Sequence, residues 1–217
     1  MVIKMKESML SKYLKISPIE ANKIEMAILF LLNSAFQNKK QIYKMHVFKF
    51  LSFLEWKAAK EFSGHFFILN FVALKWGPVP YKISEFINEN GTFQFFTYSV
   101  LKKEKDNDLN KILFSFKNLS PTYFEDYFNW EYFSENEKKI LKEASEWILK
   151  FKNTNLLSDN SHRIMKSWEK AWEKAVENSK KSVFFDFSYE IGIPKTDEDY
   201  EEILKLYKIE CKNNYEL

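Results

Sequence analysis

The side chains that could bind a metal or act as nucleophiles are few and widely separated. The three histidines are His46, His65 and His162, and the one cysteine is Cys211. Their spacing matches no metal-ligand pattern, so the sequence predicts no metal and no cofactor. Ser161 directly precedes His162, but neighbours on a helix point about 100° apart, so adjacency is no sign of a nucleophile with its base.

Phosphate-binding and hydrolase motifs are missing as well. The chain has only four glycines, and it contains no P-loop, no dinucleotide-binding glycine fingerprint and no nucleophile elbow. We therefore expect that the protein is not an enzyme. A hydrolase would require a cluster of carboxylates or histidines that only folding brings together.

Charge is unevenly distributed along the chain, and arginine is nearly absent. Residues 1–62 carry 11 lysines and five acids, whereas residues 196–217 carry three lysines and seven acids. Arg163 is the one arginine beside 32 lysines, although arginine is the side chain best suited to guanine and phosphate. We therefore do not expect a nucleic-acid partner. Mixed lysines and acids are typical of solvated helix faces, and the asymmetry could steer a charged protein partner.

The composition predicts a folded protein in a reducing compartment. Hydrophobic residues make up 46% and charged residues 29% of the chain, as in soluble globular domains. The longest uncharged stretches have 13 residues, fewer than the ~18 that span a bilayer. No apolar segment follows the first lysines, and a single cysteine forms no internal disulfide. We expect a cytoplasmic protein without membrane contact.

Helical periodicity and capping signals predict that helices dominate. Ser17, Pro18 and Glu20 have the types and spacing of a capping box with proline at the first helical position. A second helix, which its apolar residues almost surround, is expected over residues 41–62, ended by Gly64. The first helix has one apolar face at helical spacing: Ile24, Ala27, Ile28, Leu31, Leu32 and Ala35.

The second half of the chain repeats these helix signals. Ser134 and Glu137 predict another capping box, which begins a helix that ends near residue 151. Residues 156–178 predict one short and one longer helix. An acidic C-terminal helix is expected within residues 196–217.

A smaller β component is expected between these helices. Residues 66–74 predict a strand that stops at Trp76-Gly77-Pro78-Val79-Pro80, because two prolines around one residue cannot continue a ladder. Pro80 then starts a helix over residues 81–90, and Gly91 ends it.

A hairpin and one short strand complete the prediction. Residues 92–101 pair with residues 109–117 through a charged tip at residues 102–108, and residues 184–191 include a short strand. The expected fold is mainly α with a small β component (α+β), a helical core around a strand plus a β-hairpin. All 217 residues are expected to form a single domain.

The order helix, helix, strand, helix, strand, strand over residues 17–117 is winged-helix-like. In a winged helix the third helix enters the DNA major groove. Here that helix carries Lys82, Glu85 and Glu89, for a net charge of −1, whereas phosphate binding requires several unopposed positive charges. A winged-helix-like scaffold that contacts protein fits these residues better, and a DNA-binding transcriptional regulator stays the alternative.

Two segments of the chain resemble one known family. The first combines residues 47–56 (VFKFLSFLEW), a Ser-Gly pair at residues 63–64 and residues 71–80 (FVALKWGPVP). The second is residues 156–162 (LLSDNSH), with Trp168 six residues further on. They are similar to the motifs of the Panacea domain, the family of SocA-like antitoxins also described as phage-associated GepA-like proteins. Those motifs are a helix of the form LxKLLYxAD, a TG element, an aromatic-Gly-Pro-Val turn and an LSxxxH…W segment.

The resemblance covers roughly residues 20–175 of the chain. Glu55 falls where the motif helix has its acidic residue, and Trp56 takes the place of a smaller side chain. The charged hairpin tip, the aromatic run at residues 123–133 and the acidic C-terminal helix are particular to this chain. We expect partner choice to reside in such parts.

The resemblance implies an antitoxin. Panacea-type proteins are encoded beside unrelated toxins and neutralise them, mostly by direct binding, without catalysis and without a metal. One branch, SocA itself, instead delivers its toxin to a cytoplasmic protease. We therefore expect a bacterial antitoxin whose partner is a cognate toxin from the adjacent gene, with a protease as a second partner if the chain is an adaptor.

The candidate site residues form two groups. The first belongs to the family motifs and is expected to be structural: Trp76, Gly77, Pro78, Val79, Pro80, His162 and Trp168. Within it, Gly77 is expected to adopt a backbone angle closed to other residues, and His162 to make a hydrogen bond in the core. The second group is seven aromatics within 11 residues, which either pack in the core or bind the toxin: Tyr123, Phe124, Tyr127, Phe128, Trp130, Tyr132 and Phe133.

Overall fold

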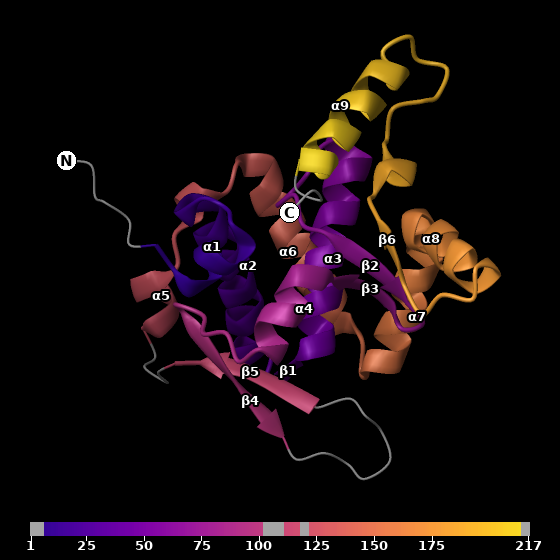
Figure 1. Cartoon of the computed structure of the whole chain (residues 1–217). Coiled ribbons are helices and arrows are strands. Elements are labelled where there is room, and N and C mark those ends of the chain that lie inside the picture. The colour runs from indigo at the N-terminus through magenta and orange to yellow at the C-terminus, as the bar shows by residue number, and fades with distance from the viewer. Residues whose placement is uncertain (1–6, 102–110, 118–121, 214–217) are drawn as a thin grey trace. The chain divides into compact units, whose positions relative to one another are not determined.

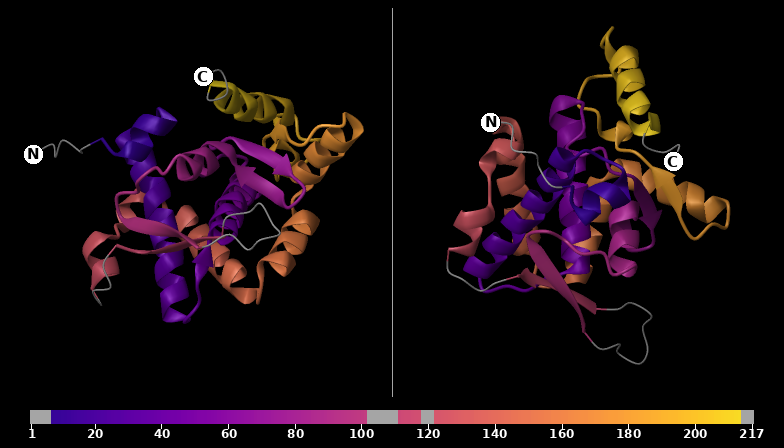
Figure 2. Two further views of the ribbon diagram at one scale, coloured as in Figure 1. Left: turned by 60° about the horizontal axis from the view of Figure 1, so that its bottom comes forward. Right: turned by 60° about the vertical axis from the view of Figure 1, so that its left-hand side comes forward.

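Helices make up most of the chain, as the sequence predicts. A computed structural model describes residues 7–101, 111–117 and 122–213 (Figures 1 and 2). These residues form nine α-helices, two short 3₁₀ helices and six strands, which pair antiparallel in two three-stranded sheets. The predicted class, mainly α with a small β component, is confirmed.

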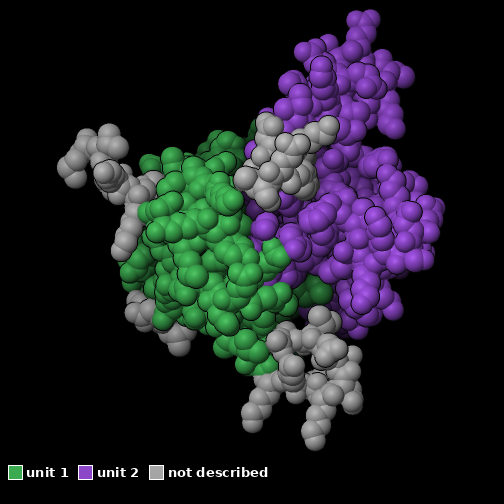
Figure 3. Space-filling view, in the orientation of Figure 1, with its two compact units in different colours: residues 1–47, 85–149 green, residues 48–84, 150–217 purple. Residues whose placement is uncertain are grey.

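Two compact units, each built from two separate stretches of the chain, contain these elements. Unit 1 comprises residues 1–47 and 85–149, and unit 2 comprises residues 48–84 and 150–217 (Figure 3). The chain therefore passes between the units three times. The single domain expected from the sequence stays a prediction.

Each unit contains one of the two sheets. Unit 1 holds α1 (Met9–Leu14), α2 (Pro18–Gln37), β1 (Ile42–Tyr43), β4 (Phe96–Leu101), β5 (Lys111–Phe116), α5 (Tyr123–Tyr127), a 3₁₀ helix (Trp130–Tyr132) and most of α6 (Glu135–Lys150). Unit 2 holds β2 (Phe71–Leu74), β3 (Gly77–Pro80), α7 (Thr154–Ile164), α8 (Lys166–Glu177), β6 (Val183–Phe185), a 3₁₀ helix (Ser188–Glu190) and α9 (Tyr200–Asn213). Besides α6, whose last residue Lys150 belongs to unit 2, two helices contribute residues to both units: α3 (Lys44–Phe62) and α4 (Tyr81–Asn88).

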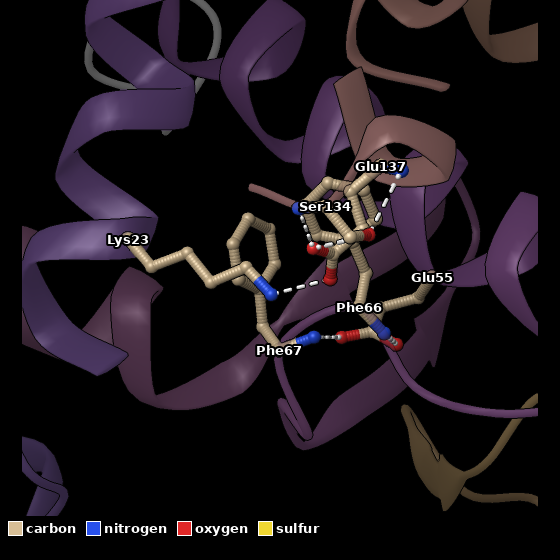
Figure 4. Close-up of polar contacts among 6 residues, drawn as sticks. All are labelled: Lys23, Glu55, Phe66, Phe67, Ser134 and Glu137. Atoms are coloured by element: carbon tan, nitrogen blue, oxygen red, sulfur yellow. Dashed lines mark hydrogen bonds and ion pairs between the residues drawn. The ribbon is translucent and has the colours of Figure 1, made fainter. Parts of the chain in front are cut away.

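Both predicted capping boxes begin helices. The Glu20 N–H donates to the Ser17 hydroxyl at 3.1 Å, and the Ser17 N–H donates to the Glu20 carboxylate at 3.0 Å. Ser134 and Glu137 make the same reciprocal pair at the start of α6, and Lys23 of α2 pairs with Glu137 at 2.5 Å (Figure 4). The capping predictions are confirmed, and the predicted apolar face of α2 is buried throughout.

The predicted hairpin is present in unit 1. β4 pairs with β5 from Phe96 opposite Phe116 to Leu101 opposite Lys111, and β1 adds a third strand in the order β1-β5-β4. The predicted tip at residues 102–108 lies outside the described residues. The winged-helix-like order of α2, α3, α4, β4 and β5 is present, with the β2–β3 hairpin inserted before α4.

The predicted strand ends at Leu74 as expected, but the prediction that the two prolines cannot belong to a ladder is wrong. β2 turns directly into β3, and β3 is the edge strand of the order β3-β2-β6. The N–H of Tyr81 donates to the Asn70 carbonyl at 2.8 Å, so alternate residues of β3 direct their N–H groups toward β2. Pro78 and Pro80 occupy the intervening positions, where no N–H is needed for the ladder.

Other element ends differ from the prediction for local reasons. The strand expected over residues 66–74 is only β2, and the strand expected over residues 184–191 is only β6. Ser63, with a φ of 54°, follows α3 in the left-handed conformation, and Asn90, with a φ of 59°, follows α4. The sequence predicted that the glycines that follow, Gly64 and Gly91, would end these two helices.

Candidate functional site

The backbone carbonyl of Trp76 is the point at which the family-motif residues meet in unit 2. Trp76 lies in the two-residue turn between β2 and β3. Lys49 of α3 donates from Nζ to this carbonyl at 2.6 Å, and Ser158 of α7 donates from Oγ at 3.3 Å. Ser158 and Trp76 are 82 residues apart in the sequence. Side chains from two helices therefore hold one turn.

Lys49 is the most deeply buried cation of this cluster. Its side chain is fully shielded from solvent, and its neighbours Phe50 and Leu51 on α3 are buried as well. Burial lowers the pKa of Lys49 from 10.5 to about 7, since water no longer stabilises the ammonium. Within the described part of the chain no carboxylate pairs with it. The Trp76 carbonyl is the acceptor that compensates this burial.

Gly77 allows the lysine to approach the turn. Its φ of +101° confirms the backbone angle that the sequence predicts. A Cβ at this position would lie 1.8 Å from Lys49 Nζ and 3.0 Å from His162 Nε2. Both nitrogens therefore face the Gly77 backbone at a distance that any side chain would prevent.

His162 and Trp168 pack as a stacked pair. Their ring centroids are 3.9 Å apart with an interplanar angle of 7°, and the Trp168 indole donates to the Leu74 carbonyl at 3.1 Å. Burial lowers the pKa of His162, and the nearby Lys49 ammonium lowers it further. His162 Nε2 is buried without a hydrogen bond of normal geometry, although the Trp76 carbonyl is close enough to oppose part of the fall in pKa. The stacked pair thus fastens α7 and α8 to the hairpin.

The acidic residue of the motif helix has a separate structural role in unit 2. Glu55 is buried, and its carboxylate accepts the N–H groups of Phe66 at 3.0 Å and Phe67 at 2.7 Å (Figure 4). These two N–H groups are the ones that a longer β2 would have placed in a ladder. Hydrogen bonds to the Glu55 carboxylate therefore replace strand pairing in the first part of the predicted strand.

The cluster around Trp76 combines an amine, an imidazole and a hydroxyl, but its polar atoms face inward. Lys49 Nζ and Ser158 Oγ both bond to the same backbone carbonyl, and His162 Nε2 is buried. The exposed member is the Trp76 indole, whose side chain is half exposed. The arrangement can hold in place the backbone that carries one exposed aromatic side chain of unit 2. In residues 7–101, 111–117 and 122–213, no three His, Cys, Asp or Glu side chains are placed to hold a metal.

The aromatic run of residues 123–133 lies in unit 1 and packs largely against that unit's own elements. Three of its rings contact Phe30 of α2, with centroids 5.4–6.4 Å away: Phe124, Phe128 and Trp130. The Tyr123 hydroxyl donates to the Phe95 carbonyl, and Tyr132 accepts from Asn22. Core packing thus accounts for most of these rings.

One ring of the run, Tyr127, is half exposed. Tyr123 and Phe133 are buried, and the remaining four side chains are partly buried. Contact of this run with a toxin stays a prediction, and Tyr127 is the ring with most surface to offer.

Lys49 and Ser158 are the site residues that sequence reasoning missed. Both stand at fixed letters of the family pattern: Lys49 at the lysine of LxKLLYxAD and Ser158 at the serine of LSxxxH. A lysine flanked on both sides by large apolar residues, in the run Val47-Phe48-Lys49-Phe50-Leu51, was the signal for a buried hydrogen bond.

No helix in the described part of the chain is both long enough and apolar enough to cross a membrane. Comparison of the chain with models of protein families, with curated proteins and with solved structures gave no match.

Proposed function

We propose that this chain is the cytoplasmic antitoxin of a toxin–antitoxin pair and neutralises its toxin by direct binding, without catalysis. The observation that carries the proposal is the meeting of the resembling segments at one turn. Residues 47–56, 71–80 and 156–168 supply the Lys49 and Ser158 hydrogen bonds to Trp76 and the Trp168 hydrogen bond to Leu74.

This meeting supports the resemblance because it gives each matched position a physical task. If the match to these short patterns were due to chance, the matched residues would not be expected to contact one another in the fold. Here the lysine, the glycine, the serine, the histidine and the tryptophan all lie at one hairpin of unit 2. Such a set is what a shared scaffold requires, and a scaffold without a catalytic motif is suited to binding.

A co-expression experiment tests the proposal. Each adjacent open reading frame is induced in cells with and without this protein, and tagged copies of both proteins are followed by pull-down and blot. We expect one flanking product to arrest growth, co-expression to relieve the arrest, and the two proteins to co-purify. Gly77→Ala should abolish relief because a Cβ there collides with Lys49, whereas the matched Gly64→Ala change, which meets no close atom, should preserve it.

The toxin level separates the two antitoxin modes. A blocking antitoxin leaves the toxin at an unchanged or higher level in a stable complex. An adaptor for a protease relieves the arrest while the toxin disappears. If neither flanking product is toxic, or if this protein relieves neither, the antitoxin proposal is wrong.

A DNA-binding regulator is the second candidate, favoured by one observation. β1 pairs with β5 in the order β1-β5-β4, and together with α2, α3 and α4 this follows the element order of a winged helix. The charges oppose it, because α4 carries Lys82 beside Glu85 and supplies little to attract phosphate. A mobility-shift assay on the chain's own promoter at low salt decides: absence of retardation eliminates this candidate.

A further inference from the structure

Trp76 has an exposed side chain, whereas its backbone is held by hydrogen bonds from buried side chains. It occupies the apex of the β2–β3 turn, and its side chain is 50% exposed. The carbonyl of the same residue receives hydrogen bonds from Lys49 and Ser158. The next residue, Gly77, has a backbone angle that fixes the direction of the chain.

An exposed tryptophan on a backbone that is held in place is well suited to binding a protein. Tryptophan is enriched among the residues that contribute most to binding energy, and these residues insert into pockets of the partner. An anchor that is already held in place loses less conformational freedom on binding, so more of its burial appears as affinity.

The polar atoms around the Trp76 ring indicate what the partner must supply. Lys75 Nζ lies 5.3 Å from the centre of the Trp76 ring. In the described residues, neither the Lys75 ammonium nor the Trp76 indole N–H has an acceptor on this chain. Both are donors, so a complementary surface offers acceptors, and a carboxylate suits the ammonium best.

We propose that Trp76 is the anchor residue of the complex and enters an apolar pocket of the toxin whose rim carries a carboxylate for Lys75. This inference rests on the proposed antitoxin function. Lys49, Ser158 and Gly77 are positioning residues in it, because they act through the turn and do not touch the toxin.

Affinity measurements with purified full-length protein and the co-expressed toxin test the anchor. We expect Trp76→Ala to weaken binding at least about 30-fold, the usual loss for a central anchor. Lys75→Glu should weaken it about tenfold, and this loss should shrink at high salt. Trp76→Phe should fall between wild type and alanine, because it retains the ring but removes the N–H donor.

Val176→Ala is the matched control. Val176 is an apolar residue of α8 in the same unit, with 60% of its side chain exposed, and it lies outside the turn. We expect its affinity to equal that of wild type. Because Trp76 is a surface residue of a turn, each variant should also keep the circular dichroism and unfolding midpoint of wild type.

The possible outcomes separate the anchor from the antitoxin function. If wild type binds the toxin and Trp76→Ala binds equally well, the anchor is wrong and the antitoxin function stands. If wild type binds neither flanking product, both are wrong. If Trp76→Ala retains toxin binding but dissolves a homodimer or loses binding to anionic vesicles, the turn serves a second copy or a membrane, and the anchor proposal is overturned.

Discussion

Two buried ionisable residues, one in each unit, should make stability depend on pH in opposite directions. Lys49 in unit 2 has a pKa lowered from 10.5 to about 7 by burial. The unfolded chain therefore binds more protons than the folded chain between pH 7 and 10.5, and stability rises with pH in that window. The contribution is fully present above pH 10.5 and is lost as the pH falls through 7.

Lys49→Met tests this dependence, because methionine keeps most of the packing without the charge. The Trp76 carbonyl keeps its hydrogen bond from Ser158 in the variant. Between pH 7 and 9, we expect the free energy of unfolding of wild type to rise relative to the variant by up to about 1.4 kcal/mol per pH unit. Urea unfolding at several pH values measures the difference. Parallel curves would show that Lys49 stays charged in the folded protein.

Glu25 in unit 1 should act in the opposite sense. Burial raises its pKa from 4.5 to about 7, although the N–H groups of Gln94 and Phe95 donate to its carboxylate. The folded chain then binds more protons than the unfolded chain, so this contribution to stability is complete below pH 4.5 and lost as the pH rises through 7. Its Oε1 and the Oδ1 of Asn22, one turn earlier on α2, are both buried without a partner in the described residues.

Glu25→Gln should therefore stabilise the protein at neutral and higher pH. Glutamine accepts the same two backbone N–H groups, carries no charge and brings an N–H₂ donor that Asn22 Oδ1 lacks at present. We expect a gain of up to about 3 kcal/mol at pH 8 and little change at pH 4. Urea unfolding at both pH values measures this. A loss of stability at pH 8 would mean that the carboxylate charge is favourable in its buried position.

At the scale of elements, the β2–β3 hairpin depends on a glycine that only the folded structure explains. Gly77→Ala places a Cβ 1.8 Å from Lys49 Nζ at a φ of +101°. We expect a loss of about 3 kcal/mol or more, from backbone strain and steric conflict together. Gly64→Ala is the control, because its nearest atom would be 3.8 Å away, and its effect should stay within about 0.5 kcal/mol. Equal losses in thermal unfolding would contradict this reading of the turn.

Elements with local causes were predictable from the sequence, whereas those with distant partners were not. The capping boxes of α2 and α6 and the apolar face of α2 involve residues within a few turns, and all are present. The short β2 depends on Glu55, 11 residues before the first N–H that it binds. β3 depends on the direction of each N–H in a ladder, which the presence of Pro78 and Pro80 does not reveal by itself.

In the candidate site, too, features with local causes were predictable from the sequence and contacts with distant residues were not. The motif resemblance singled out Gly77, His162 and Trp168, and the angle of Gly77 was predictable from its residue type. The direction of Lys49 toward a carbonyl 27 residues away was not, because periodicity gives the face of a helix and not the partner that it meets. The partial burial of Phe124, Phe128 and Trp130 likewise depends on their contacts with Phe30, far from the run in sequence.

At the scale of the whole molecule, the interleaved units separate two kinds of feature. Apart from Val47, the segments that resemble the antitoxin family and meet at the Trp76 turn belong to unit 2, whereas the aromatic run belongs to unit 1. Unit 2 draws on residues 48–84 and on residues 150–217. We therefore expect unit 2 to form only after α7, α8 and β6 have been synthesised.

Truncation tests this dependence. A fragment of residues 1–149 retains unit 1 but lacks β6, the neighbour of β2, and Trp168, which donates to the Leu74 carbonyl. We expect the amides of residues 71–74 to lose their protection from hydrogen exchange in this fragment, while those of α2 keep theirs. A control fragment of residues 1–199 lacks only α9 among these elements and should keep β2 protected. If the proposed function holds, the longer fragment neutralises the toxin and the shorter one fails. Protection of β2 in the shorter fragment would show that the hairpin is stable without the second half of its unit, and that the Trp76 turn needs only Lys49 to hold it.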